Sequence, residues 1–183
     1  MRGVKFLHYS DRADPLSLAL ARRADVIVVT GDLHGTDFAG WEAEGLTRWT
    51  AAFGVYGNHC RDGYLEDLGI TNVHGRVVPL GTLTVGGFQG CPRYKPDGPY
   101  QYDDEEARLF ADTLPRVDIL LLHAGPLDML DEQDRVHRGN PHLRRYVLER
   151  QPLLVFCGHQ YTNASMEVGP TRLERTYGAR LVT

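Results

Sequence analysis

Short apolar runs alternate with amphipathic stretches along the chain, and this alternation is typical of an α/β fold. Several of the apolar runs are rich in Val, Ile or Leu without polar alternation, as expected of strands that are covered on both faces. Residues 73–88 predict hairpins, and residues 165–183 predict short strands with turns at Gly169-Pro170 and Gly178. The runs that predict the central strands are 4–10, 25–30, 53–57, 118–123 and 153–157.

Four stretches carry the signals of helices. Asp14-Pro15 predicts an N-cap that is followed by proline at the first helical position. Residues 103–106 are all acidic, which favours a helix beginning there because the helix dipole stabilises negative charge at its N-terminus. The other two helices are expected to open at Asn140-Pro141 and, with a weaker pattern, to span 38–50.

Composition narrows the class of protein without naming a function. A chain of 183 residues fits one domain, which we expect to span residues 1–183. With 24 acidic and 20 basic residues the net charge is −4, which disfavours non-specific nucleic-acid binding. The sequence has no apolar run long enough to cross a membrane and no secretory signal pattern at its N-terminus. We therefore expect a cytoplasmic protein that does not contact membranes.

Polar side chains follow the ends of five predicted strands. In open α/β sheets ligands bind beyond the carboxyl ends of the strands, so these side chains are expected at one edge of the fold. Two aspartates, one asparagine and three histidines are the ligand types of a divalent transition metal in a mixed nitrogen and oxygen site. One such residue could be a cap or a turn, but coincidence is improbable for the ordered set. Its members are Asp11, Asp32, Asn58, His59, His123 and His159.

This ordered set resembles the calcineurin-like metallophosphoesterases, whose pattern is DxH, GD, GNH(D/E), a lone H and then GHxH. The resemblance runs from the first strand to past residue 160, which is most of the chain. It implies a four-layer α/β/β/α sandwich of two mixed sheets flanked by helices. The segments that also resemble the family's smaller phosphodiesterases are His123-Ala124-Gly125-Pro126 and His137-Arg138-Gly139-Asn140.

The resemblance also implies roles for the residues. Asp32 would bridge two metals about 3.5–4 Å apart, the usual spacing of a two-metal site. Asp11 would serve the first metal, and His59 would protonate the leaving oxygen or steady the phosphate. The second metal's shell would be completed by Asn58, His123 and His159.

The implied reaction is in-line attack on phosphorus by a metal-bound hydroxide, since metal binding lowers the pKa of water. The expected substrate is a phosphate-ester small molecule or a nucleotide, and the subgroup resemblance favours a phosphodiester. The ligand set does not choose among Mn, Fe, Zn and Ni, because that choice depends on geometry and availability.

Three positions depart from the family pattern. The histidine of DxH is Ala13, and the last histidine of GHxH is Tyr161. Both belong to the first metal, which keeps only Asp11 and the shared Asp32. The acid that usually follows GNH is Cys60, so the residue expected to orient the preceding histidine is missing. We therefore expect one firmly bound metal and a second that is weakly bound.

Three residues are candidates to compensate for the missing ligands. Asp14 could reach inward, although its role as an N-cap before Pro15 is favoured. His34 could add a nitrogen ligand or contact substrate, or it could be an exposed loop histidine. Tyr161 could bind a metal only if deprotonated, against an ordinary pKa of about 10, so hydrogen bonding or packing is favoured.

Two classes of function compete. A metal-dependent phosphoesterase is favoured because grouping the retained polar residues costs desolvation and has little structural benefit. These residues are Asp32, Asn58, His59, His123 and His159. The alternative is a catalytically weak or inactive protein of the same fold that acts as a binding module, similar to the retromer scaffold subunit. Ala13 and Tyr161 are the residues that motivate this alternative. A nuclease is disfavoured by the acidic charge.

Overall fold

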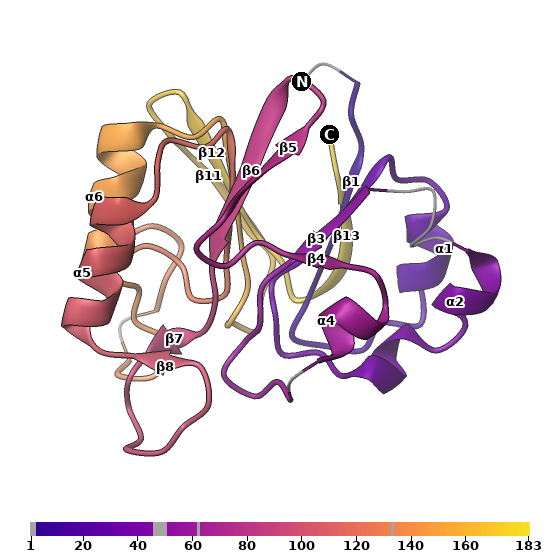
Figure 1. The fold of residues 1–183 in the computed structure, drawn as a ribbon, viewed down its shortest axis with the longest axis horizontal. Helices are drawn as coiled ribbons and strands as arrows, with labels where there is room; N and C mark the ends of the chain where they lie inside the picture. Colours follow the sequence, from indigo (N-terminus) through magenta and orange to yellow (C-terminus); the bar gives the residue numbers. More distant parts are fainter. Residues whose placement is uncertain (1–2, 46–50, 62, 133) are drawn as a thin grey trace.

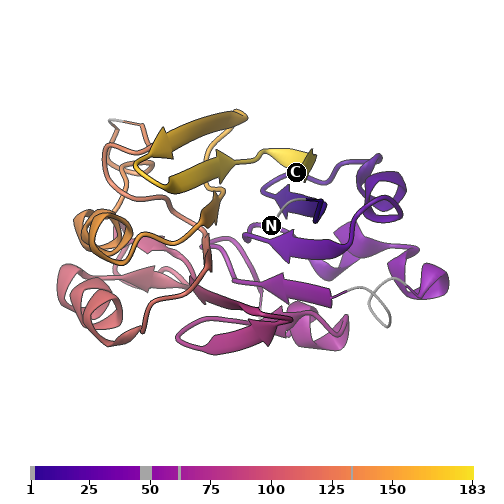
Figure 2. The same ribbon diagram turned by 90° about the horizontal axis from the view of Figure 1, so that it is seen from above.

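The computed structural model describes residues 3–45, 51–61, 63–132 and 134–183, which form four layers in the order helix, sheet, sheet, helix (Figure 1). The view from above shows the two sheets between helices on both outer sides (Figure 2). The strands of the first sheet are, in spatial order, β13 (Gly178–Val182), β1 (Phe6–Ser10), β2 (Val26–Val29), β3 (Ala51–Gly54) and β4 (Thr71–Asn72). Those of the second are β11 (Ala164–Val168), β12 (Thr171–Arg175), β10 (Leu154–Cys157), β9 (Ile119–Leu122), β6 (Leu83–Phe88) and β5 (Val77–Leu80).

Helices cover the outer face of each sheet, and both sheets mix parallel and antiparallel pairs. A short parallel pair, β7 (Cys91–Pro92) and β8 (Gln101–Tyr102), lies apart from both sheets. The elements over the first sheet are α1 (Ser17–Ala21), the 3-10 helix η1 (Gly35–Phe38), α2 (Trp41–Glu44) and α4 (Tyr64–Asp67). Those over the second are α5 (Asp104–Thr113) and α6 (Pro141–Arg150). The predicted four-layer sandwich of two mixed sheets is confirmed.

The central strands are buried on both faces because each face packs against a different layer. On β1, Leu7 and Tyr9 belong to the apolar cluster beneath the helices of the first sheet, whereas Phe6 belongs to the cluster between the sheets. On β9, Leu121 faces the other sheet and Leu122 packs toward α5 and α6. Successive side chains of a strand point to opposite faces, so an unbroken apolar run supplies both clusters. This is why these strands show no polar alternation in the sequence.

The hairpins expected within residues 73–88 and the short strands expected within residues 165–183 are confirmed. Strands β5 and β6 pair antiparallel, as do β11 and β12. After β12 the chain leaves the second sheet and enters the first, where β13 pairs antiparallel with β1. The C-terminal strand therefore lies beside the N-terminal strand and connects the two sheets.

Helix starts were predicted with mixed success. Asp103 caps α5 in a capping box and Asn140 caps α6, as their sequences indicate. Asp14 is not the N-cap of α1, because that helix begins at Ser17 and Asp14 instead accepts a bond from the backbone N–H of Leu16 at 2.8 Å.

The helix predicted over 38–50 is wrong in its extent. The structure has the short helices η1 and α2 there, separated by Ala39 and Gly40, and residues 46–50 lie outside the described part. In the part of the chain that the structure describes, the longest helices are α5 and α6, with 10 residues each. Among the described residues, none of the helices combines the length and the apolar surface that a membrane crossing requires.

Candidate metal centre

Three site residues sit in a left-handed backbone conformation directly beyond strand ends. The φ angles of Asp11, Asp32 and His159 are 64°, 52° and 65°. Positive φ is uncommon for residues other than glycine, and such strained positions concentrate at functional sites. Here the chain turns sharply as it leaves β1, β2 and β10, and all three residues line one cavity of about 300 Å³.

Four polar atoms of the predicted site converge at this cavity. The Nε2 atom of His123 lies 2.9 Å from the Oδ1 of Asn58 and 3.1 Å from the Nδ1 of His159. The Oδ2 of Asp32 lies 3.5 Å from the same nitrogen. Ligand atoms that each bind one ion at about 2.1 Å are about 3.0–3.4 Å apart, so this spacing suits a single ion. The atoms come from both sheets, because Asp32 and Asn58 follow β2 and β3 while His123 and His159 follow β9 and β10.

Backbone carbonyls set the tautomers of both histidines. His123 donates its Nδ1–H to the carbonyl oxygen of Thr30 at 2.7 Å, which leaves Nε2 as the lone-pair nitrogen of its neutral ring. His159 donates its Nε2–H to the carbonyl oxygen of Val136 at 2.8 Å, which leaves Nδ1 as its lone-pair nitrogen. Such outer partners are what orient histidine ligands in metal sites.

A hydrogen bond also orients the side-chain amide of Asn58. Its Nδ2 donates to the hydroxyl of Tyr94 at 3.0 Å, which turns the carbonyl oxygen toward His123. Neutral histidines at 3.1 Å would face each other with two lone pairs, beside a carboxylate and an amide oxygen. Four acceptors with no donor among them require a cation, either a proton or a metal ion. The residues present therefore fit a divalent metal.

Without a metal, a proton on His123 fills this role. Burial alone would lower the pKa of His123, but the negative charge of Asp32 raises it to about 9. Burial and the charge of His123 together lower the pKa of His159 to about 3. Although burial opposes its ionisation, the His123 imidazolium holds the pKa of Asp32 well below its ordinary value. At neutral pH the metal-free cluster thus holds one proton, on His123.

Metal binding at pH 7 should release close to one proton per ion. The ion takes the position of the proton on His123, whose pKa of about 9 keeps it bound at neutral pH. The affinity should therefore rise about tenfold per pH unit from pH 7 and level off near pH 9. Calorimetric titration of Mn²⁺ in two buffers of different ionisation heat measures the proton count. Release of no proton, with an affinity independent of pH, would contradict the tautomers assigned above.

Lack of space explains two of the glycines in the site motifs. A Cβ atom on Gly57 would lie 2.6 Å from the backbone nitrogen of Asp32 and 2.6 Å from the Cε1 of His123. A Cβ on Gly158 would collide with the side chains of Ser10 and Asp11. The close approach of neighbouring strand ends, which brings the ligand atoms within reach of one another, thus depends on residues without side chains.

The position that the family pattern gives to the first metal differs from the cluster around His123. Both carboxylate oxygens of Asp11 accept from the backbone N–H of His159, at 3.0 and 2.9 Å, and one also accepts from the hydroxyl of Ser10. Burial raises the pKa of Asp11 to about 6. Asp11 therefore holds the backbone of His159 in place across the two sheets. Tyr161 lines the same cavity with an exposed side chain whose ring meets His137 edge to face.

Cys60 binds the backbone where the family pattern has an acid. Its buried Sγ accepts from the backbone N–H groups of Asp32 and Gly57, each at 3.1 Å, and burial raises the pKa of its thiol. His59 also lines the cavity, and its backbone N–H donates to the Oδ1 of Asp32 at 2.8 Å. The His59 side chain is exposed and interacts electrostatically with Asp32, but among the described residues it makes no hydrogen bond or ion pair with a carboxylate.

Two of the candidate substitute ligands lie elsewhere. Asp14 directs its carboxylate to the backbone N–H groups of Leu16 and Ala179, at 2.8 and 3.4 Å. His34 is the N-cap residue of η1, and it is not among the residues that line the cavity. Among the described residues, Asp32, His123 and His159 have ligand atoms close enough together to hold one metal ion at this cavity. The side-chain oxygen of Asn58 lies beside them, in contact with His123.

Sequence reasoning missed the loop before α6. His137 lines the cavity, its ring lies 5.2 Å from that of His159, and its Nδ1 is 2.8 Å from the carboxylate of Asp134. Val136 supplies the carbonyl that orients His159. The resemblance of residues 137–140 to the smaller phosphodiesterases was a signal for His137, but a carbonyl contact leaves no mark in a sequence.

Comparisons with known proteins agree with this architecture. A family model described as calcineurin-like phosphoesterase matches residues 7–163. TT1561 from Thermus thermophilus superposes with a TM-score of 0.68 at 18% identity, over 94% of this chain and 88% of that one. Phosphopantetheinyl hydrolase PptH from Mycobacterium tuberculosis gives a TM-score of 0.60 at 14% identity, over 93% and 88% of the two chains. No curated protein matches in a sequence search. The structural likenesses, at these low identities, show the fold.

Proposed function

The chain belongs to the calcineurin-like phosphoesterase family, and on that premise we propose that it is a metal-dependent phosphoesterase. The observation that carries the proposal is the grouping of three acceptor atoms, from Asp32, Asn58 and His159, within 2.9–3.5 Å of the Nε2 of His123. The tautomers of both histidines are set by backbone carbonyls. A structural core has no need for such a cluster, because grouped acceptors without a donor are costly to bury. The residues that would hold the ion are Asp32, Asn58, His123 and His159.

A divalent ion held there supplies a water of lowered pKa and positive charge for the phosphoryl oxygens. The chain's own residues position the groups that would contact the substrate. Asp32 holds the backbone of His59, and this places the exposed imidazole at the cavity. His59 is thereby able to donate a hydrogen bond to a phosphoryl oxygen or a proton to the leaving oxygen. Because Cys60 replaces the usual acid, His59 performs this role without a carboxylate that orients its ring.

The finer features of the proposal rest on the family resemblance. We place the substrate among phosphodiesters, carried by a small molecule or a nucleotide, and the protein in the cytoplasm. Manganese is the ion to test first, with iron, zinc and nickel as alternatives that the ligand types equally allow. One ion is bound firmly, and a second is bound weakly at Asp11, since that carboxylate is already engaged by the backbone of His159.

Turnover of bis(4-nitrophenyl) phosphate should depend on added metal. We expect hydrolysis with Mn²⁺, its loss in excess chelator, and its recovery when Mn²⁺ is restored. The change is measured as release of 4-nitrophenol, with metal content followed in the same samples. Turnover that survives complete removal of metal would contradict the proposal.

The scaffold alternative predicts a different result in the same assay. Ala13 and Tyr161 remove two ligands that the family pattern places at the first metal, and this loss is the observation that favours the alternative. A protein that binds Mn²⁺, Zn²⁺, Ni²⁺ and Fe²⁺ but hydrolyses neither diesters nor monoesters with any of them would support a binding module over an enzyme.

A further inference from the structure

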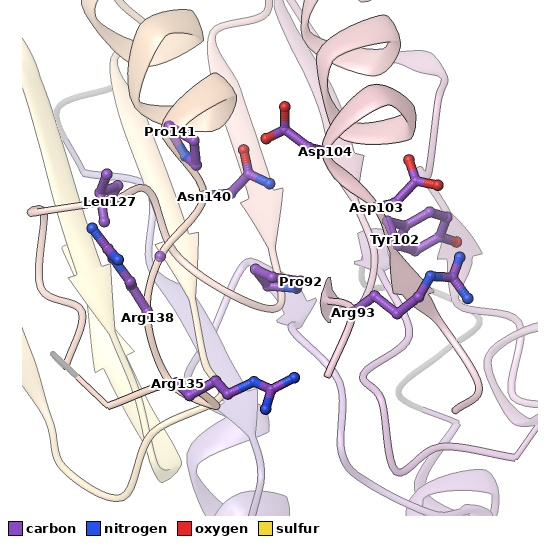
Figure 3. Close-up of a pocket in the computed structure, with 11 residues that line it drawn as sticks. Pro92, Arg93, Tyr102, Asp103, Asp104, Leu127, Arg135, Arg138, Asn140 and Pro141 are labelled. Carbon is purple, nitrogen blue, oxygen red and sulfur yellow. The ribbon is translucent and has the colours of Figure 1, made fainter. Parts of the chain in front are cut away.

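A second, larger cavity, of about 580 Å³, lies on the other side of the loop that borders the metal centre. Val136 and His137 line the metal-centre cavity, while Arg135 and Arg138 line the larger one. Neighbouring residues of one loop therefore face two cavities, which share this loop as a wall. Figure 3 shows Arg135 and Arg138 on this wall and Arg93 on the opposite one.

Some charged side chains of the larger cavity have a bonding partner and others have none. The Arg93 guanidinium pairs with Glu106 at 3.0 Å. Asp103 accepts from the backbone N–H of Glu106 at 2.9 Å, and Asp104 bonds to His142 at 3.1 Å. Within the described part of the chain, by contrast, the Arg135 and Arg138 side chains have no ion-pair partner. Among the described residues the cavity thus keeps two guanidinium groups without an ion-pair partner, although the carboxylates of Asp103 and Asp104 also line it.

The chemistry of two unpaired guanidinium groups favours one class of ligand. Their planar donors match the oxygens of phosphate in a bidentate manner, which an ammonium group cannot do. Pro92, Leu127 and Tyr102 add apolar surface to the walls, so an organic group attached to the phosphate would also make contact. The volume lies within the range that is common for small-molecule sites.

The wall that carries the arginines is held in shape before any ligand binds. The Oδ1 of Asp134 accepts from the backbone N–H groups of Val136 and His137, at 2.8 and 3.0 Å. Gln160 donates to the carbonyl oxygen of His137 at 2.9 Å, and Asp131 accepts from the backbone N–H of Gly139 at 2.8 Å. A loop fixed at these points loses little conformational entropy on binding.

We propose that this cavity is a subsite for a second phosphate group of the substrate. The inference rests on the proposed function in one respect, since the first phosphate would be the one that reacts at the metal centre. It narrows the substrate class to molecules with at least two phosphate groups separated by an organic spacer that reaches from one side of this loop to the other. Nucleoside bisphosphates and their esters are examples of the class. The arginines act as specificity-determining residues and touch no reacting atom.

The test uses adenosine 3′,5′-bisphosphate and the metal-free protein in chelator, followed by calorimetry. Binding to the wild type is expected, and the double variant Arg135→Gln/Arg138→Gln should bind about tenfold or more weakly because it loses two charge-assisted contacts. The matched control is Arg144→Gln/Arg145→Gln, which removes the same charge from α6, where these arginines pair with Asp128 and Asp112. The control should bind as the wild type does.

Two results would overturn the proposal. One is equal binding by the wild type and the Arg135→Gln/Arg138→Gln variant, or no binding by either. The other is an equal loss in the control pair, which would assign the effect to the general charge of the surface. Since the measurement needs neither metal nor turnover, failure of the subsite and failure of the proposed hydrolysis are read separately.

Discussion

Replacing Asp32 by asparagine should weaken metal binding at least about 100-fold, the upper end of the loss seen when only an outer partner of a ligand is removed. Asparagine has the same shape and retains an oxygen that can accept from the backbone N–H of His59. It lacks the negative charge that raises the pKa of His123, so that histidine would lose its proton, and the amide N–H of the asparagine would replace this proton as the donor within the cluster. The variant is therefore expected to fold, and metal content after equilibrium dialysis measures the loss.

The matched control for Asp32→Asn is His59→Ala. His59 lines the same cavity but contributes no atom to the convergent cluster, so its removal should leave the metal content unchanged and lower turnover. The two variants thus separate loss of the ion from loss of a group that contacts substrate. Full metal content in Asp32→Asn would remove Asp32 from the ligand set, and full turnover in His59→Ala would remove His59 from the reaction.

Replacing Gly57 by alanine should both destabilise the protein and disrupt the metal centre, although no ligand is changed. The new methyl group would lie 2.6 Å from the backbone nitrogen of Asp32 and from the Cε1 of His123, so the ends of β2, β3 and β9 must move apart. Overpacking of this kind costs about 1–3 kcal/mol of the free energy of unfolding. Denaturant unfolding of the metal-free protein measures that cost, and a metal titration measures the loss of affinity.

Gly35→Ala is the control for this substitution. A Cβ at Gly35 would make only an ordinary contact of 3.7 Å with Tyr64, and the residue lies in η1, shortly after Asp32 in the chain. Its free energy of unfolding should stay within about 0.5 kcal/mol of the wild type, as for most surface substitutions. Stability and metal affinity like those of the wild type in Gly57→Ala would show that the strand ends can separate without consequence.

The sequence predicted the strands and the location of the site because both depend on features that are visible in it. Unbroken apolar runs indicated strands buried on both faces, and polar residues at their ends indicated the edge where His123 and His159 meet. The structure brings together Asp32, Asn58 and these two histidines, which lie far apart in the chain. Their proximity follows a general property of α/β folds, in which ligands bind beyond the carboxyl ends of parallel strands. Their role as ligands stays a prediction.

What the sequence could not predict consists mainly of backbone contacts. The carbonyls of Thr30 and Val136 set the tautomers of the two histidines, and any residue type would offer the same oxygen. The role of Cys60 as an acceptor for two backbone N–H groups is equally invisible. Asp14 was expected to cap α1 and instead shapes the preceding turn, because Asx turns and N-caps share one sequence signal.

The ligand atoms belong to two sheets that share no strand, so an ion at this point would act as a crosslink between the halves of the fold. Asp32 and Asn58 hold it from the first sheet, and His123 and His159 from the second. Any opening that separates the sheets must then release the ion, and mass action resists that release. At a free ion concentration 100 times the dissociation constant, the bound ion would add about 2.7 kcal/mol to the free energy of unfolding. The supply of metal would then be part of what sets the equilibrium stability of the folded chain.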